Sequence, residues 1–117
     1  MMLFDTSVLV DMIREGHYEP GYISIITVIE VLRGVLEDKR SDVKKLLEES
    51  FRVLLIDNEV VKTYCRLYDA LKSMGKLIPD ADLLITSTAI AHNLVLKAKD
   101  KHFMLLEKLG LKLQLIK

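Results

Sequence analysis

Short apolar runs alternate with longer segments of helical periodicity along the whole chain. Apolar runs predict strands at residues 2–4, 22–24, 51–56 and 94–97, and alternating apolar positions predict a last, edge-like strand at 111–115. Apolar residues spaced three or four apart predict helices at 8–13, 25–36, 43–47, 60–74 and 80–92, with a short one from 100 to 103. Strands alternating with helices in this order predict an α/β fold, with a parallel sheet between helices.

Composition limits the class of protein further. The chain has 117 residues, half of them hydrophobic, with 17 basic and 17 acidic side chains. This length and hydrophobicity predict one folded domain over residues 1–117 and exclude a disordered chain. A formal net charge of zero excludes a broad basic field, so binding of nucleic acid would need a local patch or a bound cation.

Targeting signals and cysteine content predict a cytoplasmic protein with no membrane partner. The start lacks a basic leader and carries Asp5 and Asp11 within its apolar stretch, which is a poor signal peptide. The longest run without formal charge, from Leu83 to Leu96, is too short for a membrane span. Cys65 is the only cysteine, which suits a reducing compartment, and we expect it in the core.

Five acids stand where a parallel sheet of this kind binds ligands. Asp5 follows the first strand, Asp100 follows the strand at 94–97, and Asp80 and Asp82 open the helix before that strand. Glu30 lies inside an apolar segment, at the margin of a helix's buried face. Because ligands bind at the carboxyl ends of parallel strands, these acids are candidates for a shared site.

Each acid also has a purely structural explanation. Asp5 and Asp100 could be helix caps, the commoner use of aspartate between a strand and a helix. The two aspartates in the first turn of the helix at 80–92 could only complement the helix dipole, and Glu30 could pair with Arg33. Taken one at a time, none of these residues is decisive.

Considered together, the acids favour a divalent cation. Several carboxylates at one sheet edge repel one another unless a cation or a proton neutralises them. Mg²⁺ and Mn²⁺ prefer oxygen ligands and leave positions for water and phosphate, so they suit such a site. Zinc is disfavoured because His17, His92 and His102 show no zinc-ligand spacing.

Four segments resemble the successive motifs of a PIN domain, closest to the VapC-like toxin ribonucleases. They are LFDTSVLVD at 3–11, TVIEVLRG at 27–34, IPDADLLI at 78–85 and LKAKDKHF at 96–103. They span nearly the whole chain in the family's order. The resemblance implies a PIN-like three-layer sandwich, with a parallel sheet and helices on both faces. It also implies Mg²⁺- or Mn²⁺-dependent endoribonuclease activity, a small antitoxin as partner and a homodimer.

The resemblance also implies roles for individual residues. The family's acidic quartet, catalytic and metal-binding, matches Asp5, Glu30, Asp82 and Asp100. Auxiliary positions match Asp80, Thr6 and Ser7, the last two being hydroxyl residues that could orient a carboxylate or a water. The lysines at 97, 99 and 101, with the histidine at 102, could guide an RNA backbone, although such a charge run is more often a solvated surface.

Two departures keep alternatives open. Ala98 stands where the family commonly has a hydroxyl residue before the last acid, and the region from Glu37 to Ser41 is short. A catalytically weak or inactive PIN-like partner-binding protein is therefore one alternative. A phosphoacceptor domain of the receiver type is another, with Asp57 as its acceptor, but its paired acids after the first strand are lacking. The RNA target, the cleavage position and the number of metal ions stay open.

Overall fold

A computed structural model describes residues 1–116 of the chain. They form a five-stranded, all-parallel sheet with the strand order β3-β2-β1-β4-β5, as the sequence pattern predicted. The strands are β1 (Met2–Phe4), β2 (Tyr22–Ser24), β3 (Arg52–Leu54), β4 (Val95–Ala98) and β5 (Lys112–Leu115).

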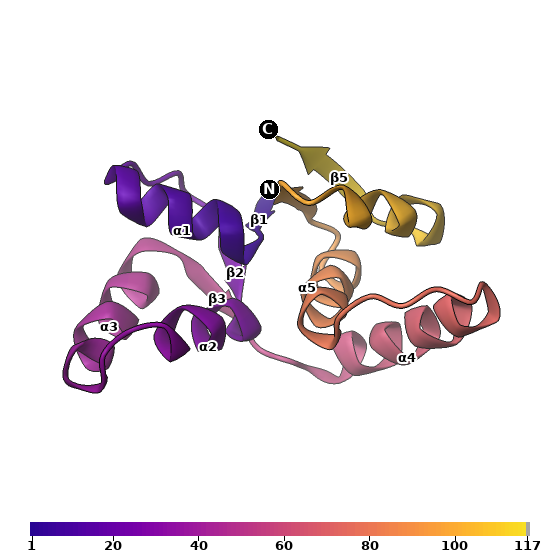
Figure 1. Cartoon of the computed structure of the whole chain (residues 1–117), viewed down its shortest axis with the longest axis horizontal. Coiled ribbons are helices and arrows are strands. Elements are labelled where there is room, and N and C mark those ends of the chain that lie inside the picture. The colour runs from indigo at the N-terminus through magenta and orange to yellow at the C-terminus, as the bar shows by residue number, and fades with distance from the viewer. Residues whose placement is uncertain (117) are drawn as a thin grey trace.

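Five α-helices and two 3₁₀ helices are distributed over both faces of this sheet in the described chain (Figure 1). They are α1 (Thr6–Glu15), α2 (Ile25–Arg33), η1 (Glu37–Lys39), α3 (Arg40–Ser50), α4 (Asn58–Ser73), α5 (Asp80–Ala91) and η2 (Lys101–Leu109). No helix within residues 1–116 is long and apolar enough to cross a lipid bilayer.

The pleat of β1 divides the hydrophobic core into two clusters. Leu3 and Phe4 are both fully buried, and because successive side chains of a strand point to opposite faces, each belongs to a different cluster. The cluster around Leu3 packs against α4, α5 and η2, whereas the cluster around Phe4 packs against α1, α2 and α3. Figure 1 shows these two groups of helices on either side of the strands.

Because β1 is the central strand, the segments that follow β1, β2 and β4 meet at one edge of the sheet. β1 pairs with β2 on one side and with β4 on the other, and the Asp5 amide extends the ladder by donating to the Lys97 carbonyl at 3.0 Å. The start of α1, the start of α2 and the loop after β4 therefore lie near one another at the carboxyl ends of these strands.

Four local expectations differ from the structure. The strand expected at 51–56 covers only Arg52–Leu54. α2 ends at Arg33 and not at 36; Gly34 follows as its C-cap, and Arg40 Nε donates to the carbonyls of Leu32 and Val35. The helix after β4 is longer than expected and continues to Leu109. Cys65 is exposed on α4, not buried in the core.

Candidate functional site

A cavity of about 320 Å³ opens at the carboxyl edge of the sheet, and the predicted acidic quartet lines it. Its lining residues come from the loops after β1 and β4 and from helices α1, α2, α5 and η2. They are Asp5, Thr6, Ser7, Glu30, Asp82, Asp100, His102 and Phe103. The structure thus brings together acids that are up to 95 positions apart in sequence (from Asp5 to Asp100).

Asp5 is the most deeply placed acid of the cavity. It is only 6% exposed, its Oδ2 accepts a 3.0 Å hydrogen bond from Ser7 Oγ, and its side chain makes no capping bond to α1. Burial is the largest cause and raises the pKa of the Asp5 carboxyl. Hydrogen bonds from the Ser7 hydroxyl and from the Thr6 and Ser7 amides oppose this, and the Glu30 charge raises the pKa further. The net shift is upward, so Asp5 is a buried acid whose ionised form is disfavoured despite these hydrogen bonds.

Asp82 lies on the first turn of α5 and faces the same cavity. Its side chain is 23% exposed, and burial is the main cause that raises the pKa of its carboxyl. The charge of Asp5 raises this pKa next, His102 lowers it, and Glu30 and Asp100 raise it further. The three other cavity acids thus all act on Asp82, which is the electrostatic consequence of their proximity.

Glu30 is held by hydroxyl groups within the protein. Thr6 Oγ1 donates to Glu30 Oε1 at 2.7 Å, and the same Thr6 oxygen lies 3.0 Å from Thr27 Oγ1. Arg33 Nη2 is 3.9 Å from Glu30 Oε2, at the outer limit of an ion pair, and the Arg33 side chain is 74% exposed. The Thr6 hydrogen bond therefore fixes the Glu30 carboxylate more firmly than the surface pair does.

Asp100 combines a capping contact with a place in the cavity. Its Oδ1 accepts from the His102 amide at 2.9 Å and caps η2, so the capping explanation holds for this residue. Its side chain is 60% exposed, far more than that of Asp82. Asp100 is accordingly the outermost acid of the quartet.

His102 was expected only to guide RNA, but its ring lies between two acids. Nδ1 is 2.9 Å from Asp100 Oδ1 and Nε2 is 3.0 Å from Asp82 Oδ2. The position of His102 two residues after Asp100, at the start of η2, is the only sequence signal for this placement. Thr27 gave no such signal, because its contact with Thr6 exists only in the folded chain.

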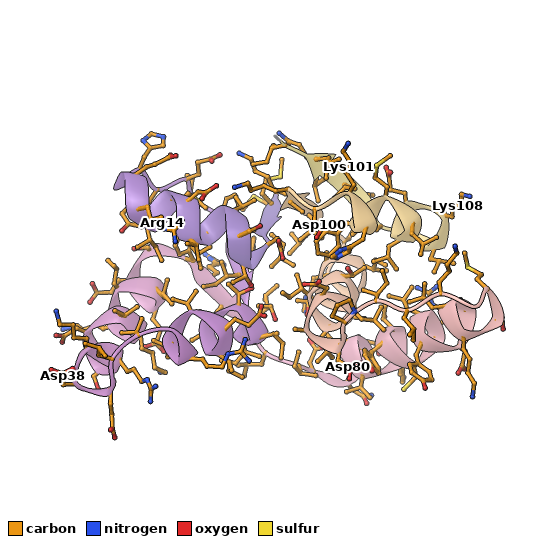
Figure 2. The ribbon with its side chains drawn as sticks, viewed as in Figure 1. Arg14, Asp38, Asp80, Asp100, Lys101 and Lys108 are labelled. Atoms are coloured by element: carbon orange, nitrogen blue, oxygen red, sulfur yellow. The ribbon has the colours of Figure 1, made fainter. Side chains whose placement is uncertain are left out.

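Asp80 does not line the cavity, in contrast to its expected auxiliary role. Tyr64 Oη donates to Asp80 Oδ1 at 2.7 Å, which raises the pKa of Tyr64 to about 12. Asp80 instead borders a mainly apolar cavity of about 290 Å³ between α4 and α5. Residues two apart on a helix differ by about 200° around its axis, so Asp80 and Asp82 face different ways. Figure 2 shows Asp80 well separated from Asp100.

Other charged residues are paired away from the cavity. Lys97 Nζ lies 3.0 Å from Glu19 Oε2 and Lys99 Nζ lies 2.6 Å from Asp11 Oδ2, so these lysines are already paired with acids. Lys101 is exposed beside Asp100, and Figure 2 shows both residues at the start of η2. Only part of the basic run is thus available to a phosphate backbone.

The phosphoacceptor alternative has no support in the geometry. Asp57 accepts from the Val60 amide at 2.9 Å and thereby caps α4, and His92 Nε2 lies 2.9 Å from its other oxygen. These contacts lower the pKa of Asp57, the Val60 hydrogen bond being the largest cause. Asp57 therefore has a structural explanation and lies outside the acidic cavity.

The donor set of the cavity fits a hard divalent cation. Within residues 1–116, no three His, Cys, Asp or Glu side chains stand close enough to hold one ion together. Mg²⁺ needs only one or two direct carboxylates and keeps water in its other positions. Four carboxylates, with neighbouring hydroxyls, around a cavity of this size meet that requirement. Burial, with the charges of neighbouring cavity acids, raises the pKa of Asp5 and of Asp82, and a bound cation would offset both effects.

Comparison with known proteins gives a consistent result. The PIN domain model matches residues 2–109 of the chain. Ribonuclease VapC1 of Methanocaldococcus jannaschii is 41% identical over 96% of this chain and 85% of its own length, and Ribonuclease VapC1 of Rickettsia felis is 33% identical over 85% and 87%. VapBC2 from Rickettsia felis, solved with a promoter DNA fragment, shares the fold with a TM-score of 0.82 at 21% identity, covering 99% of this chain and 98% of that one.

The chain therefore belongs to the PIN-domain family, which the four resembling segments had predicted. Within this family it is a VapC-type ribonuclease toxin of a toxin–antitoxin system. Ribonucleases of this family are generally metal-dependent. The ribonuclease interpretation is thus confirmed at the level of the family.

Proposed function

We propose that this protein hydrolyses RNA phosphodiester bonds with a divalent cation, Mg²⁺ or Mn²⁺, held by Asp5 and Asp82 directly or through water. Glu30 and Asp100 complete the negative cavity. The observation that carries this proposal is the convergence of the four acids on one cavity in which two carboxyls have raised pKa values. When bound, the cation would lower the pKa of a water and neutralise charge that builds on the phosphodiester.

The residues of the chain would prepare this site in different ways. Ser7 Oγ holds the Asp5 carboxylate by donating to its Oδ2, at the wall of the cavity. Thr6 holds one oxygen of Glu30 in the same manner. Because these carboxylates are fixed before RNA binds, little reorganisation is needed at the moment of reaction.

RNA would be attracted locally, not by overall charge. The net charge is zero, and the acidic cavity by itself would repel a phosphate. Arg33 and Lys101 have exposed side chains beside the cavity acids Glu30 and Asp100, and they are the basic groups that support contact with the RNA backbone. We propose no recognition of base sequence.

We also propose a small antitoxin as partner and a homodimer as the assembly. The similar solved structures include a toxin-antitoxin complex from Klebsiella pneumoniae and VapBC-5 from Mycobacterium tuberculosis, a member of the VapBC family of toxin-antitoxin systems, and they support an antitoxin partner. Exposed apolar side chains on α4 and the following loop support self-association, which sedimentation of the purified chain would test. They are Val61, Tyr68, Met74 and Leu77. RNA as substrate and a single cysteine favour work in the cytoplasm.

Cleavage of single-stranded RNA by the purified chain tests the proposed reaction. We expect cutting with Mg²⁺ or Mn²⁺ and none with excess EDTA. Asp5→Asn and Asp82→Asn should each lower the rate about a hundredfold or more, because each removes a charge that holds the cation. The measurement is the initial rate on a labelled RNA, with circular dichroism to confirm folding.

Asp57→Asn is the matched control, because Asp57 is an acid outside the cavity and asparagine caps a helix equally well. This variant should cut RNA at the rate of the unchanged protein. If Asp5→Asn or Asp82→Asn also retained that rate, the proposed roles of these acids would be wrong.

A further inference from the structure

Three side chains form a continuous hydrogen-bonded chain from the protein interior to the cavity. Thr6 Oγ1 donates its single hydrogen to Glu30 Oε1 at 2.7 Å, because a carboxylate can only accept. Thr6 Oγ1 lies 3.0 Å from Thr27 Oγ1, and since the Thr6 hydrogen is already used, the Thr27 hydroxyl must be the donor. The direction of donation is thus fixed, from Thr27 to Thr6 to Glu30.

The placement of these residues makes the arrangement rigid. Thr27 is fully buried, and it lies three positions before Glu30 on α2, so both side chains project from the same face of the helix. Thr6 is the first residue of α1, and α2 therefore holds it at two points. A buried β-branched side chain has little rotational freedom, so Thr27 fixes where the Thr6 oxygen and its hydrogen can lie.

This geometry restricts the side chain of Glu30. A hydroxyl that accepts a hydrogen bond becomes a stronger donor, so Thr27 strengthens the bond from Thr6 to Glu30 Oε1. Glutamate has much side-chain freedom to lose, and a single directed bond is what restricts it here. Without the Thr27 hydroxyl, the Thr6 hydroxyl would be a weaker and less firmly placed donor, so the Glu30 carboxylate would sample several orientations.

We propose that Thr27, which does not line the cavity, is a positioning residue of the ribonuclease: it holds Thr6 as a donor to Glu30 and would so fix the Glu30 carboxylate for cation binding. This inference rests on the proposed metal-dependent function. It assigns Thr27 no contact with RNA. Removal of its hydroxyl should therefore weaken cation binding and slow the chemical step, with little change in the affinity for RNA.

Thr27→Val is the direct test, because valine has the same shape without the hydroxyl. We expect the affinity for Mn²⁺, measured by calorimetry without RNA, to fall about tenfold. We expect kcat for RNA cleavage to fall by a similar factor, while KM changes less than about twofold. Thr27→Ser keeps the hydroxyl and should restore both values. An unchanged Mn²⁺ affinity in Thr27→Val would overturn the proposal.

Thr88→Val is the matched control. Thr88 is also a fully buried helical threonine, but its hydroxyl donates to the Leu84 carbonyl within α5 at 2.8 Å. This variant loses a buried hydrogen bond of ordinary kind and should bind Mn²⁺ as the unchanged protein does. An equal loss of affinity in Thr88→Val would mean that the effect comes from general destabilisation, and the role of Thr27 would be rejected.

A double-mutant cycle tests whether Thr27 acts through Thr6. Thr6→Val alone should weaken Mn²⁺ binding about as much as Thr27→Val does, and adding Thr27→Val to it should change nothing further. Additive losses would show that Thr27 acts by packing and would overturn the proposal. Thr6→Val also tests the proposal if Thr27→Val does not fold. An unchanged Mn²⁺ affinity in Thr6→Val would mean that the bond from Thr6 to Glu30 does not support cation binding, and the proposal would be rejected.

The outcome also separates this inference from the proposed function. If the unchanged protein neither binds Mn²⁺ nor cuts RNA, the proposed function fails and the inference fails with it. If the unchanged protein does both and Asp82→Asn does neither, the function stands. In that case, Thr27→Val with normal Mn²⁺ affinity rejects only the role of Thr27.

Discussion

The four acids of the cavity differ in how much of their charge is compensated by neighbours. Asp100 is largely exposed and caps η2, and Glu30 accepts a short bond from Thr6. Asp5 and Asp82 are more buried, and for both the causes that raise the pKa outweigh those that lower it. A raised pKa of an acid means that the folded state binds the proton more tightly than the unfolded chain does. The ionised forms of Asp5 and Asp82 thus oppose folding when no cation is bound.

Asp82→Asn should therefore raise the melting temperature of the protein in EDTA, by a few degrees at neutral pH. Asparagine removes the repulsion from Asp5, and the loss of the His102 contact does not outweigh this, because the net pKa shift is upward. The stabilisation should shrink as the pH falls through the raised folded-state pKa. It should vanish well below 3.8, the ordinary pKa of this carboxyl, where the unchanged protein is protonated too.

Differential scanning fluorimetry across pH measures this effect, with Asp100→Asn as control. Asp100 is exposed, and asparagine keeps its capping bond, so this variant should melt close to the unchanged protein. A melting temperature of Asp82→Asn at or below that of the unchanged protein would mean that the Asp82 carboxylate stabilises the fold, and the prediction would be wrong.

Side chains of the cavity were predictable where a motif carries them and unpredictable where only the fold does. The quartet followed from four segments in the family's order, whereas spacing in sequence does not show that the rotation of α5 turns Asp80 away from the cavity that Asp82 lines. Thr27 could not be recognised, since its partner Thr6 is 21 positions away. The Thr27 hydroxyl can position Thr6 only through a contact in the folded chain, and the hydrophobic periodicity of the sequence does not reveal that contact.

The start of β2 approaches β1 closely at Gly21. A Cβ atom added there would lie 2.6 Å from Phe4 Cε2 and 3.0 Å from the Met2 carbonyl oxygen. The Phe4 ring is fully buried in the cluster that packs α1, α2 and α3 on the sheet, so it has little room to move away. The approach of β2 to β1, which places α2 and Glu30 at the cavity, thus requires glycine at position 21.

Gly21→Ala should lower the free energy of unfolding by about 1–3 kcal/mol, the usual cost of forcing an extra methyl group into a packed core. Urea denaturation followed by circular dichroism measures it. Gly34→Ala is the control, because the nearest atom to its added Cβ is an ordinary 3.6 Å away. Its effect should stay within about 0.5 kcal/mol. Equal unfolding free energies for Gly21→Ala and Gly34→Ala would show that the Phe4 ring moves aside for the added methyl group, and the prediction would be wrong.

The order of helices and strands was predictable because apolar periodicity indicates which side chains are buried. The exact ends of the helices were less predictable. The apolar pattern continues to Leu36, but this side chain is 72% exposed, and the bonds from Arg40 end α2 three residues earlier. Those bonds join residues from different elements. An end of a helix that a distant side chain decides cannot be found in a local pattern.

For the protein as a whole, the cavity is the place where the two helical groups meet. Asp5 and Glu30 belong to the group formed by α1 and α2, whereas Asp82 and Asp100 belong to α5 and η2 on the other side of the sheet. Like charges at this junction push the two groups apart. A cation held between them would remove this repulsion and would attract the acids of both groups. Cation binding should therefore stabilise the entire fold and not one loop.

Addition of Mn²⁺ should accordingly raise the melting temperature in proportion to the logarithm of its concentration. At a concentration a hundred times Kd, binding to the folded state alone adds about 2.7 kcal/mol to the free energy of unfolding. The double variant Asp5→Asn with Asp82→Asn should lose this response, although it melts higher than the unchanged protein in EDTA. KCl at matched ionic strength controls for screening of surface charges. If Mn²⁺ stabilised the double variant as much as the unchanged protein, the ion would bind elsewhere, and the cavity would not be the metal site.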